Sequence, residues 1–168
     1  MRFARWAFGL GLLVLVSISA YADNRTCLVV GVSDGDTITA RCGFPGSYDQ
    51  VKVRINGVDA PEKKQPFGQR AKEAMSDLVF GRSVDLACHK VDRYGRSVCK
   101  VSVNGRDVGL EMLALGMAWW YRSYAKEQSR EDRANYETME AQARESRLGL
   151  WRDANPVAPW EWRKERRP

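Results

Sequence analysis

The sequence predicts a single α+β domain, and three features support this prediction. Two hairpin turns, at 34–36 and 92–96, are each flanked by runs of alternating apolar residues. A third strand is expected at 51–55, and three other stretches are expected to be helices. The chain has 168 residues, enough for one hydrophobic core, and contains no repeat, low-complexity tract or internal linker.

The first 22 residues have the segment order of a secretory signal peptide. Two arginines precede an apolar run at 7–18, and Ala20-Tyr21-Ala22 forms a small-x-small cleavage site. The run is too short to span a bilayer comfortably, so a retained membrane anchor is the minor alternative. We therefore expect cleavage after Ala22, a secreted or periplasmic mature protein at 23–168, and no membrane attachment after cleavage.

Export predicts an oxidising compartment for the mature protein, and the positions of the four cysteines test this prediction. Cys27 and Cys42 are equidistant from the first hairpin turn, and Cys88 and Cys99 are equidistant from the second. Residues opposed across an antiparallel hairpin are close enough to form a disulfide. We predict disulfides Cys27–Cys42 and Cys88–Cys99, although four cysteines can pair in three ways and four free buried thiols are the other alternative. No Cys-x-x-Cys spacing indicates a zinc site.

The chain is basic, with a formal net charge of +6 that falls to +4 when Arg2 and Arg5 leave with the signal peptide. A basic secreted domain suits an anionic partner, either nucleic acid or a cell surface. Charge alone does not distinguish the two.

The first hairpin is expected from 27–33 and 37–42. Asp34-Gly35 is an ordinary tight-turn signal, so Asp34 needs no functional explanation. Asp36 is not required by the turn and places a second carboxylate at the mouth of the hairpin.

The third strand brings three charged residues to one place. Apolar residues alternate with polar ones at 51–56, so Arg54 points away from the apolar face. After Gly57, Asp59 and Glu62 flank Ala60-Pro61, where the proline keeps the chain extended. An arginine, an aspartate and a glutamate therefore leave one strand end together, although a polar strand face followed by a charged turn would look the same.

A helix is expected at about 66–80, because its apolar residues fall on one face and Gly81 ends it. The second hairpin, 83–91 and 96–103, follows. Its turn at 92–96 holds two arginines and an exposed tyrosine.

The last two helices are expected from Asp107, as a cap, to Leu115, and at about 129–146. The segment 148–151 should then dock on the core. This ends a folded domain at 23–151. The basic tail at 152–168 contains prolines and tryptophans, and we expect it to be extended and only partly fixed.

An aromatic cluster lies between these two helices. Trp119, Trp120, Tyr121 and Tyr124 follow one another closely, with Arg122 among them. Aromatic residues mixed with arginine can stack bases, but aromatic clusters in small proteins more often belong to the core.

The polar residues singled out above suggest a hard metal ion held by carboxylates and a phosphate group held by arginines. They are Asp36, Asp59, Glu62, Arg54 and Arg96. His89 is the only histidine, which excludes a two-histidine ribonuclease mechanism and histidine-based metal nuclease chemistry. Any hydrolysis must therefore use carboxylates, a metal ion and arginines.

Three motifs in register give a resemblance that covers nearly all of the mature chain. Asp34-Gly-Asp-Thr37, Arg54-Ile-Asn-Gly-Val-Asp-Ala-Pro-Glu62 and Asp92-Arg-Tyr-Gly-Arg96 resemble the signatures of the staphylococcal nuclease (thermonuclease) family, as do 140–143 and 148–151. The resemblance implies a β-barrel plus helices, namely a five-stranded OB-fold-type barrel with three helices. It also implies a calcium-dependent endonuclease that hydrolyses DNA and RNA and leaves 3′-phosphate ends.

The resemblance also implies roles for individual residues. Asp36, Asp59 and the carbonyl of Ala60 match the calcium ligands, Arg54 and Arg96 the arginines that clamp the scissile phosphate, and Glu62 the proposed general base. Arg93, Tyr94 and Tyr124 match residues that hold the adjoining nucleotide. Arg122 is a further candidate for this role and stands where the best-known member has a tyrosine, while Arg93 and Ala60 replace a lysine and a threonine.

Two other functions compete with the nuclease. One is a non-catalytic OB-fold nucleic-acid-binding module, which would be free to lose the carboxylates and arginines; all five are present here. The other is a basic cell-surface protein, which would explain the charge but not the motifs. In each case a monomer is the default expectation.

Overall fold

The computed structural model describes residues 23–166. The expected signal peptide, 1–22, lies outside the described residues. Within the described part, no helix is both long and apolar enough to cross a membrane.

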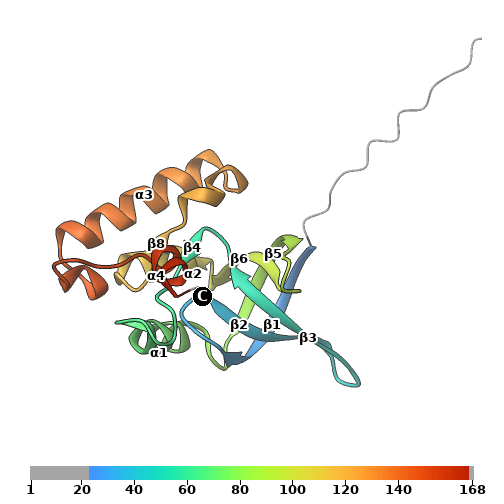
Figure 1. Cartoon of the computed structure of the whole chain (residues 1–168). Helices are drawn as coiled ribbons and strands as arrows, with labels where there is room; N and C mark the ends of the chain where they lie inside the picture. Colours follow the sequence, from blue (N-terminus) through green and yellow to red (C-terminus); the bar gives the residue numbers. More distant parts are fainter. Residues whose placement is uncertain (1–22, 167–168) are drawn as a thin grey trace, which may run out of the picture.

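Five strands form a closed barrel, as expected for an OB-type fold. They are β1 Asp23–Val32, β2 Thr37–Phe44, β3 Ser47–Ile55, β5 Ser83–Val91 and β6 Ser97–Val103. The strands follow the order β3-β2-β1-β5-β6, and parallel pairing between β3 and β6 closes the barrel. Figure 1 shows the barrel on one side of the molecule and most of the helices on the other.

Three short strands join the barrel to the helical side. β4 (Val58–Asp59) pairs with β8 (Trp119–Trp120), and β7 (Arg106–Asp107) pairs with the end of β6. Because β4 follows β3 almost directly, the β4–β8 pair ties the strand that carries Arg54 to the aromatic cluster.

Three of the helices match the expected ones. They are α1 Gly68–Val79, α2 Val108–Ala114 and α3 Arg130–Glu145. Asp107 caps α2 as predicted, since its side chain accepts hydrogen bonds from the backbone N–H groups of Gly109 and Leu110. Ser129 caps α3 in the same way. Two 3₁₀ helices, Arg122–Glu127 and Gly149–Arg152, lie before and after α3.

Both predicted disulfides are present in the structure. Cys88 and Cys99 are direct cross-strand partners on β5 and β6, and Cys27 on β1 is bonded to Cys42 on β2. Each disulfide therefore crosslinks the two strands of one hairpin, as the equal spacing from the turns predicted.

The described residues have two hydrophobic clusters. The larger fills the barrel and the space under α1 and α2. The smaller contains Trp119, Ala143, Leu150, Trp151 and Ala158, with Trp160 packed against it. Trp119 and Trp120 are thus core residues, and the segment at 148–151 docks on the core as expected.

The prediction of an extended, only partly fixed tail is wrong. Residues Pro159–Glu165 form a fourth helix, α4, which Figure 1 shows folded back beside β4 and β8. Trp160 on α4 packs edge-on against Trp119, with ring centroids 5.6 Å apart. Burial of aromatic surface against the smaller cluster explains why this segment is fixed.

Candidate active site

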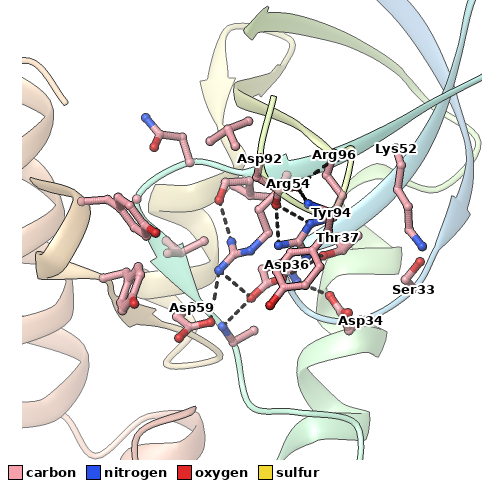
Figure 2. A pocket seen from close by; sticks show the side chains of 18 of the residues that line it. Ser33, Asp34, Asp36, Thr37, Lys52, Arg54, Asp59, Asp92, Tyr94 and Arg96 are labelled. Atoms are coloured by element: carbon pink, nitrogen blue, oxygen red, sulfur yellow. Dashed lines mark hydrogen bonds and ion pairs between the residues drawn. The ribbon is translucent and has the colours of Figure 1, made fainter. Parts of the chain in front are cut away.

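A cleft of about 770 Å³ lies where the ends of β2, β3 and β4 meet the 92–96 turn and the aromatic segment. All five residues of the predicted constellation line it: Asp36, Arg54, Asp59, Glu62 and Arg96. Ala60, Arg93, Tyr94 and Tyr124 line it as well. Figure 2 shows Asp36, Arg54, Asp59 and Arg96 pointing toward one another from different segments.

Two buried carboxylates converge on one guanidinium. Arg54 Nη2 lies 3.2 Å from Asp36 Oδ2 and 3.1 Å from Asp59 Oδ1. Arg54 Nη1 donates a hydrogen bond to the carbonyl oxygen of Ile55 at 2.7 Å, which fixes the direction of the side chain. The three side chains therefore form a preorganised charged group at the end of β3 (Figure 2).

The backbone positions Asp36 directly. Its carboxylate accepts hydrogen bonds from the amide of Ala60 at 2.8 Å and from the hydroxyl of Thr37 at 3.0 Å. Gly35 permits this approach, because a Cβ at that position would lie only 2.6 Å from the Cβ of Ala60 and 2.7 Å from that of Ala71. The first hairpin turn thus packs against the loop that carries Asp59.

Burial raises the pKa values of two carboxyl groups in the cleft. Burial, reinforced by the charge of Asp36, raises the pKa of Asp34 to about 6. Burial also raises the pKa of Asp59, against the lowering effect of Arg163 and Arg54. Burial is thus the main cause of both raised pKa values, and positive charge close to these carboxylates favours their ionised form.

The 92–96 turn holds Arg96 in place. Asp92 Oδ2 accepts a hydrogen bond from Arg96 Nε at 2.7 Å, and Asp92 Oδ1 accepts from the amides of Tyr94 and Arg96. Burial opposes the ionisation of Asp92, but the hydrogen bonds from Arg96 and Tyr94 keep its pKa below the ordinary value. Arg96 also reaches Thr37 at 3.3 Å, and this contact links the turn to the first hairpin.

Glu62 lies at the rim of the cleft, with its side chain 41% exposed. Its backbone amide donates a hydrogen bond to Gln65 Oε1 at 3.0 Å, which orders the loop after Pro61. Its carboxylate Oε1 accepts a hydrogen bond from Arg163 Nη1 at 2.7 Å.

Arg163 is a cleft residue that the sequence motifs did not reveal. It comes from α4 and also binds Asp59 through both terminal nitrogens, at 2.7 Å to Oδ2 and 3.2 Å to Oδ1. Although burial lowers it, the pKa of Arg163 is raised overall by these two carboxylates, so the group is cationic. Pro159 at the helix start, with Arg163 and Lys164 in the last turn, was the sequence signal for α4.

The proposed nucleotide-binding residues divide into two groups. Tyr94 and Tyr124 are 68% and 46% exposed, and both face the cleft with cations over their rings, Arg93 over Tyr94 and Lys90 over Tyr124. Arg122 does not line the cleft; its guanidinium binds Glu140 Oε2 at 2.9 Å and lies over the ring of Trp120. This position does not support the predicted contact between Arg122 and substrate.

His89, on β5, is bound to Glu127 at 3.2 Å and does not line the cleft. Of the aromatic cluster, Tyr121 and Tyr124 face the cleft while the two tryptophans are core. The core interpretation of that cluster is therefore confirmed for the two tryptophans, and base stacking by the two tyrosines stays a prediction.

The donor set fits a hard cation. Asp36 and Asp59 are both buried, converge on one point and are neutralised by guanidinium groups, and carboxylate and carbonyl oxygens are the ligands that Ca²⁺ prefers. Between residues 23 and 166, no three or more His, Cys, Asp or Glu side chains are grouped so that they could hold a metal ion. A bound ion would therefore take the rest of its ligands from backbone oxygens, such as the carbonyl of Ala60, and from water.

Comparisons with known proteins agree with this geometry. The model of a family described as staphylococcal nuclease homologues matches residues 52–153. The chain is 39% identical over 155 residues to an "Uncharacterized endonuclease" of Haemophilus influenzae, covering 92% of this chain and 82% of the relative. It is 37% identical over 167 residues to a "Micrococcal nuclease" of Shigella flexneri, covering 94% and 91%.

A plant relative matches over a shorter stretch. The "Staphylococcal-like nuclease CAN1" of Arabidopsis thaliana is 40% identical over 118 residues, which is 70% of this chain and 35% of that protein.

Proposed function

Because the chain belongs to the staphylococcal nuclease family and is a phosphodiester hydrolase, we propose that it is a calcium-dependent endonuclease acting on both DNA and RNA. We further propose that it leaves 3′-phosphate ends. The observation that carries the proposal is the convergence of Asp36 and Asp59 on Arg54, beside Arg96 and Glu62, in one open cleft.

The two arginines are the proposed phosphate clamp, and their orientation supports this role. Arg54 and Arg96 approach the cleft from different strand ends, and each is oriented by its own fixed partner, the carbonyl of Ile55 and the carboxylate of Asp92. Guanidinium forks bind phosphate oxygens through paired hydrogen bonds. Preorganised donors of this kind stabilise the extra negative charge of a five-coordinate phosphorus.

Glu62 is the only carboxylate of the constellation that is substantially exposed. In the proposed reaction it orients a water molecule and accepts its proton as the oxygen bonds to phosphorus. The bond between phosphorus and the 5′ oxygen breaks, the 5′ oxygen takes up a proton from solvent, and the phosphate stays on the 3′ side.

Asp36, Asp59 and the Ala60 carbonyl are the proposed calcium ligands. When bound there, a calcium ion would supply positive charge that favours the developing negative charge of the phosphate. Tyr94, Tyr124 and Arg93 then hold the adjoining nucleotide, because their rings and guanidinium line the same cleft.

We also propose that the protein works outside the cytoplasm, as a secreted or periplasmic monomer. The two disulfides support this proposal, because such bonds persist in oxidising compartments. Detection of mature chain in periplasmic or culture fractions, with its N-terminus read by mass spectrometry, tests it. A chain that retains residues 1–22 would contradict cleavage.

The activity is tested by incubating the purified protein with single-stranded DNA or RNA in calcium, in magnesium and in chelator. We expect cutting of both substrates in calcium, none in chelator, and products that carry 3′-phosphates. Sequencing of the ends or their resistance to a 3′-extending polymerase reads this chemistry.

Glu62→Gln in the same assay separates catalysis from binding. We expect it to bind substrate and cut at least about a hundredfold more slowly. Failure of the folded, disulfide-bonded protein to cut in any of these conditions would contradict the proposed function, and so would products with 5′-phosphates.

A further inference from the structure

Arg163 makes a bidentate contact with a buried carboxylate of the cleft. Its two terminal nitrogens bind the two oxygens of Asp59, and one of them also binds Glu62. Asp59 is only 3% exposed, whereas Arg163 is 38% exposed. The cation therefore reaches into the cleft from outside, over a separation of 104 residues in the chain.

The segment that delivers Arg163 is also anchored by contacts that involve neither Asp59 nor Glu62. Trp160 packs against Trp119 and against Tyr121, with centroid distances of 5.6 and 5.4 Å. Gln65 Nε2 donates a hydrogen bond to the carbonyl of Val157 at 2.6 Å, just before α4. These contacts fix the start of α4, so the guanidinium one turn later is held near the carboxylates.

Arg163 binds the carboxylate oxygens of Asp59 that a divalent cation would need as ligands. Asp59 Oδ1 is shared between Arg54 and Arg163, and Asp59 Oδ2 is bound to Arg163. Both oxygens of Asp59 are therefore already bound to a cationic side chain with which a metal ion would have to compete, and a positive charge close to the site repels the ion. The same guanidinium holds Glu62 Oε1.

We infer that Arg163 is an internal competitor of the divalent cation, which holds Asp59 and Glu62 in the metal-free protein and releases Asp59 when the cation binds. The inference rests on the proposed function, because it takes Asp59 as a metal ligand. Arg163 thereby lowers the affinity for the cation. The half-exposed side chain can move into solvent without unfolding the barrel.

Calcium binding by the metal-free protein tests the inference directly. Isothermal titration of protein expressed from the full chain would compare the natural sequence with Arg163→Gln and Arg163→Lys. We expect Arg163→Gln to bind Ca²⁺ about three- to tenfold more tightly, since a competing charge is removed. Arg163→Lys should lie between the two, because it keeps the charge and loses the fork.

Arg166→Gln is the matched control. Arg166 ends α4 and lies over the ring of Trp162, so its removal takes one positive charge from the same helix without touching Asp59. We expect a change in calcium affinity of less than about twofold, because exposed charges are screened. If Arg166→Gln gained as much calcium affinity as Arg163→Gln, the effect would come from net charge alone, and the inference would be overturned.

Hydrogen exchange of the natural protein gives a second measurement that needs no variant. With calcium bound, the amides at 161–165 should exchange at least about threefold faster, because α4 has lost one of its anchors. Tight calcium binding with unchanged exchange in α4, and equal affinity in Arg163→Gln, would overturn the inference and leave the proposed function standing. Absence of calcium binding in both proteins would overturn both.

Discussion

The cleft has two walls that are held in place by different means. The barrel wall consists of Asp36, Arg54, Asp59 and Arg96, and the helical wall consists of Tyr121, Tyr124 and Arg163. Backbone amides, carbonyls and short ion pairs position the barrel wall. The helical wall relies more on side chains: ring contacts join Tyr124 to Tyr121 and Tyr121 to Trp160, and ion pairs hold Arg163, although one backbone hydrogen bond also ties Tyr121 to Gly57.

Because of this difference, we expect the barrel wall to carry the chemical step and the helical wall to adjust ligand binding. Strand register and hydrogen bonds fix the barrel wall, where small displacements would cost catalysis. Side-chain packing on a seven-residue helix fixes the helical wall, which can shift at lower cost. Substitutions in the barrel wall should therefore mainly change the cleavage rate, and substitutions in the helical wall should mainly change ligand binding.

Replacement of the central arginine should have the largest effect. Arg54→Ala is expected to lower the cleavage rate at least about a hundredfold, because a preorganised donor to the phosphate is lost. It should also destabilise the protein in chelator, since Asp36 and Asp59 lose their shared partner, and calcium should restore that stability. Single-turnover cleavage and thermal melts with and without calcium measure both effects.

Arg152→Ala is the control for this prediction. Arg152 is exposed and ends the second 3₁₀ helix, so we expect nearly natural rates. An Arg54→Ala variant that kept most of its activity would remove Arg54 from the phosphate clamp.

Loss of a disulfide should weaken the frame of the barrel wall. Replacing Cys27 and Cys42 together by alanine should lower the free energy of unfolding by about 3 kcal/mol, since the bond closes a chain separation of 15 residues. Urea denaturation measures this loss. The specific activity of the fraction that remains folded should stay close to that of the natural protein, because neither cysteine lines the cleft. A parallel loss of activity in fully folded protein would show that the barrel wall depends on the crosslink.

The same difference explains which parts of the site the sequence could predict. Asp36, Arg54, Asp59 and Glu62 lie in turns and strand ends with local signals, and the strands bring them together by register. Cysteine spacing predicted both disulfides because hairpin geometry is symmetric about its turn. Such contacts follow from local rules.

The helical wall follows from tertiary packing, which local patterns do not contain. The last segment has several charged residues and two tryptophans in a short helix, and its fixed position depends on ring contacts with Trp119 and Tyr121. The position of Arg122 away from the cleft has the same origin. The buried acceptor Glu140, 18 residues later in the chain, captures its guanidinium.

Asp34, which is hydrogen-bonded to Asp36 of the barrel wall, offers a smaller test through the pH dependence of stability. Its pKa rises from 3.8 in the unfolded chain to about 6 in the folded protein, so between these values the folded state holds a proton that the unfolded state has released. Stability from this group therefore falls as pH rises through that window, and the full penalty is present above it.

Asp34→Asn should remove this penalty. In chelator, we expect the variant to gain about 1–2 kcal/mol over the natural protein at pH 7 and almost nothing at pH 3.5. The asparagine oxygen can still accept the hydrogen bond from the amide of Asp36. Urea denaturation at several pH values measures the difference, and a gain that is equal at all of them would exclude titration of Asp34 as its cause.

The smallest expected effect concerns the helical wall and distinguishes Tyr124 from Arg122. Tyr124 faces the cleft with Lys90 over its ring, so Tyr124→Ala should raise the KM for single-stranded DNA by about five- to tenfold, the lower end of the range for one stacked base. The kcat should change less, because Tyr124 touches neither the carboxylates nor the arginines of the barrel wall. Arg122→Ala should change the KM by less than about twofold and instead lower stability, since buried Glu140 loses a partner. If Arg122→Ala raised the KM as much as Tyr124→Ala, Arg122 would have to contact the substrate, which requires the aromatic segment to turn during binding. The helical wall would then include both Arg122 and Tyr124.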